Sequence, residues 1–219
     1  MTKFPISPIF IPANKLDYVD KALNSGADGI IFDLEDSVLQ EDKISARDNL
    51  YAFLVKNSLD ILSYIRINDL NTETGITDLD FFKDLDYGII IPKFESDKDF
   101  IKIPDKLSII PLIETPLAIK NLGKIASGRN VTGLAFGAAD LSSIIGSEMN
   151  WDSMLYARSK IINECSINNI FSIDSPFMDT LDTKGLESES KLSKSIGFNG
   201  KATINPSQIN VVKKYFLPT

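Results

Sequence analysis

The stretch "GIIFDLED" (residues 29–36) shows the unit from which this chain is built. An uninterrupted apolar run ends in acidic residues, and a polar pattern with helical spacing follows near 41–57. Apolar runs of this kind are typical of parallel strands, because such strands are buried on both faces. A strand-type run followed by a helix indicates a βαβ unit in a parallel sheet.

The same unit recurs eight times along the chain. The apolar runs are "PIFIPA" (8–13), "GIIFDLED" (29–36), "SYIRIND" (63–69), "GIIIPKFE" (88–95), "SIIPLIET" (108–115), "VTGLAFGAAD" (131–140), "IFSIDSP" (170–176) and "GKATIN" (200–205). Helical patterns lie near 15–25, 41–57, 78–85, 97–101 and 116–127, before and across 151–167, and near 183–196, and "PSQINVVKKYF" ends the series. Eight repeats in 219 residues predict an α/β fold, a (β/α)₈ TIM barrel that forms one domain over 1–219. A doubly wound open sheet is the alternative, but neither glycine-rich phosphate-binding pattern, GxGxxG or GxxxxGK[ST], occurs.

The composition excludes several classes of protein. The net charge is −7 and no basic run is present, which argues against a nucleic-acid partner. No 18-residue apolar span and no leader pattern occur, so we expect a cytoplasmic protein without a membrane partner. Cys165 is the one cysteine and lies in a helical pattern with apolar neighbours, which indicates a core residue in a reducing compartment. Because histidine is absent, histidine-ligated zinc sites and Ser–His–Asp triads are excluded.

Charged and polar residues gather where the apolar runs end. They are Asp33, Glu35, Asp36, Arg66, Asn68, Lys93, Glu95, Glu114, Thr115, Asp140, Asp174, Ser175 and Asn205. The carboxyl ends of the strands carry the active site in TIM barrels, so we expect one site at this end.

Three of these groups need partners. Glu114 comes late in an apolar run, where an unpaired charge costs several kcal/mol, so it requires a partner or a metal. Arg66 requires a counter-charge from nearby acids, either as part of a site or as a structural ion pair. Asp33 and Glu35 share a strand face by the period of two, which is costly without a cation or a shared proton.

Other positions allow two interpretations. Lys93 is either a buried Schiff-base lysine or, as we favour, charge balance among the acids, and it is a candidate substrate-binding residue. Asp174 is a hydrogen-bond partner at the barrel mouth or a catalyst. Asp140 is either the N-cap of the helix that follows or a metal ligand.

The ends of the fifth and sixth runs suggest a metal site. Glu114 and Asp140 lie there and would be close in space, because the two strands are neighbours in a barrel. Oxygen ligands without imidazole favour Mg²⁺ or Mn²⁺. Such a metal would polarise a 2-oxo acid and stabilise an enolate. Arg66 would bind the other carboxylate through both arms, and the small residues before Asp140, such as Ala138, would leave room for substrate.

Eight motifs make the chain resemble a known family. They are "FIPANK", "KALNSGADGIIFDLEDSV", "EDKISAR", "IRIN", "IIPKFES", "LIETPLAI", "GLAFGAADL" and "FNGKATINPSQI". In this order and over nearly the whole chain, they resemble the citrate lyase β-subunit-like branch of the HpcH/HpaI aldolase family, in the phosphoenolpyruvate/pyruvate barrel superfamily.

The resemblance implies a metal-dependent carbon–carbon lyase. Such enzymes cleave or form bonds in citryl-, malyl- or citramalyl-type thioesters, or in related hydroxy-oxo acids, through an enolate. Glu114 and Asp140 match the Mg²⁺ ligands, and Arg66 matches the substrate-binding arginine. Glu35 and Asp36 match the acids of the "LED" motif, and either of them or a metal-bound water is the candidate general base. The resemblance also implies a homotrimer or homohexamer.

The chain departs from the family pattern at four places. Ile6 stands where an arginine is usual, Ala139 where an acid is common, and Asn205 where a histidine is often found. The chain also ends shortly after "PSQINVVKKYF", where typical members continue for several tens of residues, so we expect a C-terminally short form. The substrate is therefore a small carboxylic acid or, less readily, its CoA thioester. The alternative is a catalytically degenerate barrel that acts as a binding or regulatory subunit.

Overall fold

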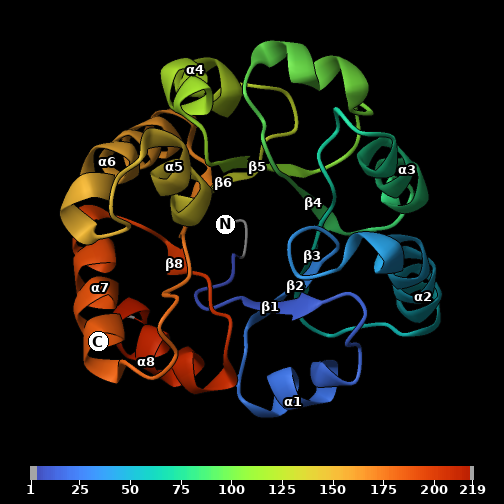
Figure 1. Cartoon of the computed structure of the whole chain (residues 1–219), viewed down its shortest axis with the longest axis horizontal. Coiled ribbons are helices and arrows are strands. Elements are labelled where there is room, and N and C mark those ends of the chain that lie inside the picture. Colours follow the sequence, from blue (N-terminus) through green and yellow to red (C-terminus); the bar gives the residue numbers. More distant parts are fainter. Residues whose placement is uncertain (1–3, 218–219) are drawn as a thin grey trace.

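Strands and helices alternate along the chain in a computed structural model that describes residues 4–217 (Figure 1). The strands are β1 (Ile9–Pro12), β2 (Gly29–Asp33), β3 (Leu62–Arg66), β4 (Gly88–Ile91), β5 (Ile109–Ile113), β6 (Gly133–Phe136), β7 (Phe171–Asp174) and β8 (Gly200–Lys201). The helices are α1 (Tyr18–Asn24), α2 (Lys43–Lys56), α3 (Glu73–Phe82), α4 (Pro116–Ala126), α5 (Ala138–Ile145), α6 (Trp151–Asn168), α7 (Thr183–Ile196) and α8 (Pro206–Phe216). Two 3₁₀ helices, Gln40–Asp42 and Asp97–Lys102, complete the series.

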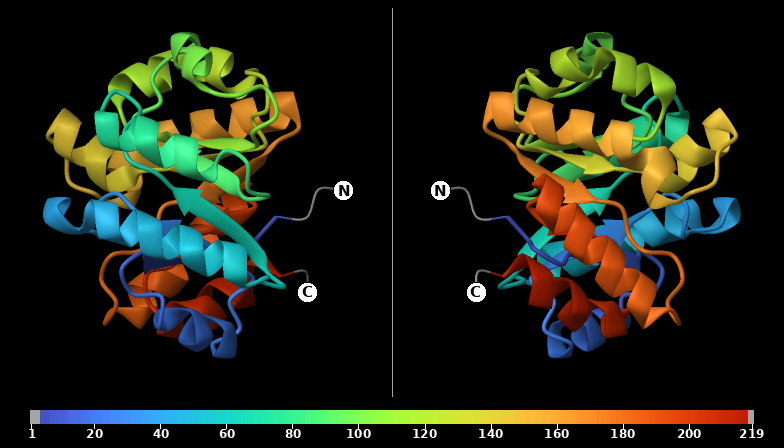
Figure 2. Two further views of the ribbon diagram at one scale, coloured as in Figure 1. Left: turned by 90° about the vertical axis from the view of Figure 1, so that its right-hand side faces the viewer. Right: turned by 90° about the vertical axis from the view of Figure 1, so that its left-hand side faces the viewer.

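The strands form one parallel sheet in sequence order, from β1 to β8. Its two edges meet, because Thr203 pairs with Ile9 beyond the end of β8. Phe10 N donates a 2.9 Å hydrogen bond to Thr203 O, and Thr203 N donates a 2.8 Å bond to Pro8 O. The helices surround the strands in all three views (Figures 1 and 2). The predicted (β/α)₈ barrel is therefore confirmed.

Alternate residues of each strand belong to two separate apolar cores. On β2, Ile30 and Phe32 pack outward against the helices, whereas Ile31 between them points into the barrel. The inner core consists of Ile31, Tyr64, Ile90, Ile110, Leu112, Ala135, Phe171, Ile173 and Ala202. Because both faces are buried, the strands read as continuous apolar runs, and the period of two decides which residue faces the barrel axis.

Two helical segments differ from the sequence prediction. Helix α3 begins at Glu73 and not near 78, because the Thr72 side chain accepts a hydrogen bond from Gly75 N and caps the first turn. The segment predicted at 97–101 is the 3₁₀ helix Asp97–Lys102, which begins with a capping box between Ser96 and Asp99.

Within residues 4–217, no helix combines the length and the apolar character that crossing a bilayer requires.

Candidate active site

A cavity of about 340 Å³ lies at the end of the barrel where the strands finish. Its walls continue the inward side of the strands by the same period of two. Inward-facing Ile31 is followed by Asp33, and inward-facing Leu112 is followed by Glu114. Arg66 ends β3 at the equivalent position. Of the polar side chains at strand ends, those at inward-facing positions therefore meet in one cavity.

Asp33 and Arg66 form a two-armed ion pair at the ends of adjacent strands. Arg66 Nε lies 2.7 Å from Asp33 Oδ1, and Arg66 Nη2 lies 2.7 Å from Asp33 Oδ2. Burial raises the pKa of Asp33, but the Arg66 guanidinium outweighs this effect and holds that pKa below its usual value. The guanidinium also lies 5.0 Å from the centre of the Phe10 ring. The predicted counter-charge of Arg66 is therefore present. Asp33 occupies the Nε–Nη2 edge of the Arg66 guanidinium.

The two acids of the "LED" motif, Glu35 and Asp36, lie in the turn after β2, which ends at Asp33. Asp36 is exposed, lines the cavity and contacts Arg66 Nη1 at 3.1 Å. Glu35 is buried and lies outside the cavity lining, with Oε2 3.2 Å from Arg66 Nη1. Burial raises the pKa of Glu35 to about 8, because the attraction of Arg66 does not offset the loss of hydration. Glu35 therefore keeps a proton near neutral pH, whereas Asp36 is the acid that a ligand can reach.

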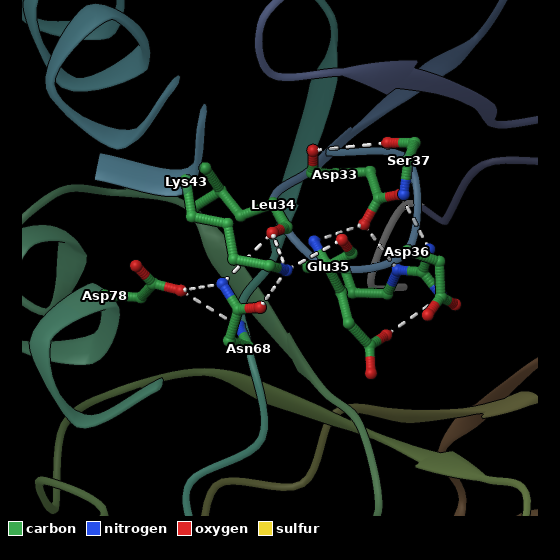
Figure 3. A network of polar contacts seen from close by, with 9 residues as sticks. Asp33, Leu34, Glu35, Asp36, Ser37, Lys43, Asn68 and Asp78 are labelled. Atoms are coloured by element: carbon green, nitrogen blue, oxygen red, sulfur yellow. Dashed lines mark hydrogen bonds and ion pairs between the residues drawn. The ribbon is translucent and has the colours of Figure 1, made fainter. Parts of the chain in front are cut away.

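The turn that carries these acids is anchored from α2 and from the loop after β3 (Figure 3). Lys43 Nζ donates hydrogen bonds to the backbone oxygens of Leu34 (3.1 Å) and Glu35 (2.9 Å) and to Asn68 Oδ1 (2.5 Å). Asn68 Nδ2 donates to Leu34 O and to the fully buried Asp78. Lys43 thus uses its three donors to fix the backbone that presents Glu35 and Asp36 to Arg66.

Glu114 lies beyond the end of β5 and is buried, with one carboxylate oxygen bonded. Its Oε1 accepts a 2.8 Å hydrogen bond from Lys93 N. Burial raises the pKa of Glu114 to about 7, and the nearby Asp140 carboxylate adds to this increase. A carboxyl group in this position is poised between its neutral and charged forms, and a cation beside it would favour the charged form.

Lys93 contributes its backbone and not its ammonium group. Its side chain is exposed, and it forms no ion pair with the acids within residues 4–217. Its backbone has a φ of 50°, a left-handed conformation that aims the N–H at Glu114. The interpretation as a buried Schiff-base lysine is therefore wrong, whereas charge balance and substrate binding by the Lys93 side chain stay predictions.

Asp140 lies in the first turn of α5 but does not cap it. The helix begins at Ala138, and Gly137 is the N-cap residue. The N-cap interpretation of Asp140 is therefore wrong, and its carboxylate faces the cavity that Glu114 and Ala138 also line. A Cβ atom at Gly137 would lie 2.8 Å from Glu114 Oε2 and 2.6 Å from Glu114 Cβ. Only glycine leaves this space beside the second carboxylate oxygen.

Glu114 and Asp140 fit a magnesium ion that is also bound by water and substrate better than a metal ion bound only by protein side chains. Among the described residues, no three or more histidine, cysteine, aspartate or glutamate side chains converge on one point. Mg²⁺ is bound through one or two carboxylates and completes its shell with water and substrate oxygens. Glu114 and Asp140 supply hard oxygen donors that line one cavity, and the missing side chain of Gly137 lets Glu114 pack closely against the start of α5.

Asp174 belongs to a different cluster, on the outward side of β7. Arg158 Nε of α6 lies 2.9 Å from Asp174 Oδ1, and Lys201 Nζ of β8 lies 3.1 Å from Oδ2. Glu189 of α7 contacts both cations, at 3.5 Å and 2.6 Å. Burial alone would raise the pKa of Asp174, but Lys201 and Arg158 hold it below its usual value. Asp174 is therefore a structural partner between barrel and helices.

Some residues that support the site lie outside the strand ends and carry no pattern that predicts such a role. Lys43 and Asp78 lie within helices, where a charged residue is ordinarily read as solvated surface. The signal that could have found Asp78 is its position on the inner side of α3, beside Gly75, Leu79 and Phe82. For Lys43, the motif "EDKISAR" was noted without a role.

Comparison with known proteins places this geometry in a family. The family model HpcH/HpaI aldolase/citrate lyase matches residues 7–206. A (3S)-malyl-CoA thioesterase of Cereibacter sphaeroides is 30% identical over 97% of this chain and 77% of its own length. The crystal structure of RipC from Yersinia pestis is 33% identical, with a TM-score of 0.84 over 98% of this chain and 95% of that one.

A third similar protein was crystallised with ligands. It is the citrate lyase beta subunit of Mycobacterium tuberculosis complexed with oxaloacetate and magnesium, 30% identical, with a TM-score of 0.87 over 97% of this chain and 96% of that one. The match of the family model over nearly all strands and helices agrees with the barrel and its acid-lined cavity. The chain therefore belongs to the HpcH/HpaI aldolase/citrate lyase family.

Proposed function

We propose that this protein is a Mg²⁺-dependent carbon–carbon lyase that acts on a small hydroxy-oxo acid or its CoA thioester. The observation that carries the proposal is the meeting of Glu114, Asp140 and Arg66 in one cavity. Similar proteins bear the names citrate lyase beta subunit and malyl-CoA thioesterase, and one was crystallised with magnesium and oxaloacetate. We expect a homotrimer or homohexamer, as the family resemblance implies.

Glu114 and Asp140 would hold the metal, with the free oxygen of Glu114 beside Gly137 as one donor. When bound, Mg²⁺ would polarise the carbonyl group of the substrate and stabilise the negative charge that develops as the carbon–carbon bond breaks. The hydrogen bond from Lys93 N fixes the Glu114 carboxylate through its other oxygen. The chain thus contributes the orientation of both ligands before substrate enters.

Arg66 would bind the carboxylate of the substrate through Nη1 and not through both arms. Its Nε–Nη2 edge is held by Asp33, whereas Nη1 points to the exposed Asp36. A substrate carboxylate that binds Nη1 would displace Asp36 from this contact. Asp33 therefore positions the guanidinium, and Asp36 exchanges with the ligand.

Asp36 is the proposed general base for the hydroxyl proton of the substrate, because it lines the cavity and is accessible. The electron pair of the alkoxide then forms the new carbonyl as the carbon–carbon bond breaks, and the other fragment leaves as an enolate. Glu35 stays beneath Arg66 in its protonated form and adds no further negative charge. We therefore propose Asp36, which lines the cavity, and not Glu35 as the base.

The test is a cleavage assay with purified protein, with and without Mg²⁺, on malyl-, citramalyl- and citryl-thioesters and the free acids. A 2-oxo acid product should appear only with metal. Glu114→Gln should weaken Mg²⁺ binding and product formation by about 10²–10³-fold. Glu95→Gln is the matched control, since this glutamate also follows a strand but lies outside the cavity lining. Full activity in Glu114→Gln would refute the assignment.

A binding or regulatory subunit is the second candidate, favoured by the closed Asp33–Arg66 pair. In that case Mg²⁺ and a 2-oxo acid would bind with no turnover of any substrate in the assay above. Turnover with a 2-oxo acid product would exclude it.

A further inference from the structure

A second cavity of about 250 Å³ adjoins the first at the mouth of the barrel. The two cavities share a border of lining residues, namely Ala138, Met149, Ser175, Pro176 and Met178. Ala138 begins α5, two residues before the proposed metal ligand Asp140, and its side chain is a single methyl group. The second cavity therefore continues the first one past Ala138, toward β7 and α6.

Arg158 of α6 forms part of the wall of the second cavity and has one donor left over. Its Nε lies 2.9 Å from Asp174 Oδ1, and its Nη2 lies 3.5 Å from both Ser175 Oγ and Glu189 Oε1. Its Nη1 is buried and has no hydrogen-bond partner among the described residues. Because an unpaired buried donor is costly, Nη1 indicates an acceptor that enters from the cavity.

The guanidinium of Arg158 is fixed in its place. Its carbon Cζ lies 4.6 Å from the centre of the Trp151 ring and 5.4 Å from the centre of the Phe136 ring. These rings and the ion pair with Asp174 hold the group from its faces and from one edge. Nη1 cannot turn to another partner without the loss of these contacts, so the donor is preorganised.

The charges around Arg158 are already balanced. Arg158 and Lys201 carry two positive charges, and Asp174 and Glu189 carry two negative charges. The exposed Asp179 adds a further negative charge to the lining of the second cavity. A ligand carboxylate would meet this negative excess, whereas an uncharged oxygen would not. The acceptor that fits Nη1 is therefore uncharged.

Glu189 adds a place for a donor beside that acceptor. It lines the second cavity, and its contacts with Lys201 and with Arg158 Nη2 both use Oε1. Its Oε2 accepts no hydrogen bond from any of the residues 4–217. A hydroxyl group can accept from a guanidinium and at the same time donate to a carboxylate, whereas an alkyl group can do neither.

We propose that the second cavity binds an uncharged hydroxyl group on the tail of the substrate, beyond the bond that is cleaved. The hydroxyl oxygen accepts from Arg158 Nη1, and the hydroxyl proton is donated to Glu189. The cavity thus selects a 2-oxo acid with a hydroxylated tail over acids with an alkyl or a carboxylate end. This inference rests on the proposed function for the placement of the 2-oxo acid end, because Glu114 and Asp140 hold that end.

Calorimetric binding to the Mg²⁺-loaded protein tests the inference with acids that differ only at their ends. The first set is 5-hydroxy-2-oxopentanoate, its methyl isostere 2-oxohexanoate, and 2-oxoglutarate. The second set is one carbon longer and consists of 6-hydroxy-2-oxohexanoate, 2-oxoheptanoate and 2-oxoadipate. In at least one set, the hydroxyl end should bind at least about tenfold more tightly than either other end. Equal affinities in both sets, or a preference for the methyl or carboxylate end, would overturn the inference.

Trp151 gives a second readout of the same experiment. It is the one tryptophan of the chain, and it stacks on Arg158. A hydroxylated acid that reaches Arg158 should change the fluorescence of Trp151, whereas pyruvate, which has no tail, should leave it unchanged. A preference for the hydroxyl end without a change in this fluorescence would place the hydroxyl elsewhere and contradict the inference.

Glu189→Gln should change the selectivity for the end group. The amide keeps a hydrogen-bonding group beside Arg158 but removes one negative charge from the wall. The dicarboxylate should gain at least about tenfold in affinity relative to the hydroxylated acid of the same set. Glu187→Gln is the matched control, since Glu187 lies on the same helix, outside both cavities, and pairs with Lys214. An unchanged ratio in Glu189→Gln, with native thermal unfolding, would refute the inference.

Arg158→Lys tests the donor itself. The lysine keeps a positive charge for Asp174 but lacks the planar group that places Nη1 between the two rings. The preference for the hydroxyl end over the methyl end should vanish. Mg²⁺ affinity should match that of the wild type, since Glu114 and Asp140 are untouched. A preference retained in the folded variant would remove Arg158 from this role.

The readout is binding, so the result separates from that of the proposed function. A preference for the hydroxyl end in a protein without lyase turnover would support the inference and refute the proposed activity. Turnover without this preference would do the reverse, and binding of none of these acids, pyruvate included, would refute both.

Discussion

Two buried ion clusters lie at the carboxyl end of the barrel strands, and they face opposite sides of the sheet. Asp33 with Arg66 lies on the inward side and lines the cavity. Asp174 with Arg158 and Lys201 lies on the outward side, packed under α6 and α7. On β2, Asp33 comes two residues after inward-facing Ile31 and therefore also faces inward. On β7, Asp174 comes one residue after inward-facing Ile173 and therefore faces outward.

The difference shows that the face of the sheet on which a strand-end residue lies decides whether it lines the cavity or stabilises the packing of helices on the barrel. Both aspartates end an apolar run, both are buried and both have a pKa held low by cations. A shift of one residue along the strand turns the side chain to the other face. We therefore expect substitutions in the outward cluster to affect folding, and those in the inward cluster to affect ligand binding.

The largest expected effect is on stability, from Asp174→Asn. Arg158 and Lys201 would then be buried with one counter-charge, Glu189, in place of two. Removal of one partner of a buried ion pair costs about 3–5 kcal/mol in the free energy of unfolding. Denaturant unfolding measures it, and the folded fraction should still bind Mg²⁺ with the affinity of the wild type. A loss of Mg²⁺ affinity with unchanged stability would break the comparison.

Glu114→Gln should have the converse effect. The amide keeps the hydrogen bond from Lys93 N but lacks the charge that binds a cation. We expect a loss of about 10²–10³ in kcat/KM, or of metal binding if no turnover is found, because an interaction at the reacting centre is removed. Stability should be retained, since a buried carboxyl with a raised pKa is replaced by a neutral group. Titration with Mg²⁺ and denaturant unfolding give both values.

Lys43→Met should weaken function by a smaller factor. The ammonium group fixes the turn that presents Glu35 and Asp36 to Arg66, without touching the cavity. Loss of such an outer partner typically costs about 10–100-fold. We expect the loss in kcat at saturating substrate, because Asp36 is misplaced as a base. Lys56→Met at the exposed end of the same helix is the control, and equal effects of the two variants would remove Lys43 from this role.

The sequence predicted the barrel because each strand repeats the same local pattern. Glu114 and Arg66 were predictable for a similar reason, since a charge within an apolar run must have a partner. The role of Lys93 was not, because its left-handed backbone at φ 50° has no signature in a lysine side chain. Helix α5 begins at Ala138, three residues before the start at Leu141 that a cap at Asp140 would require, because Gly137 holds the N-cap position.

Which face of the sheet a strand-end residue lies on could not be predicted from a single apolar run. A run buried on both faces shows no alternation of apolar and polar residues, so β7 by itself does not reveal whether Asp174 faces in or out. Partners distant in sequence decide it, namely Arg158 on α6 and Lys201 on β8. From the sequence alone, Asp174 is therefore not distinguished from the residues of the site.

The last expected effect is the pH dependence of stability from Glu35, which lies in the inward cluster beside Arg66. It lies beside Arg66, yet burial raises its pKa from 4.5 to about 8, since the attraction of Arg66 does not offset the loss of hydration. The folded protein holds this proton more tightly than the unfolded chain does. The resulting stability is fully present below about pH 4.5 and is lost as pH rises through about 8. Glu35→Gln should therefore flatten the decline in unfolding free energy between these values in the metal-free protein, whereas Glu95→Gln should leave it unchanged. An equal decline in wild type and Glu35→Gln would show that Arg66 serves Glu35 as it serves Asp33, and the inward cluster would then be as fully paired as the outward one.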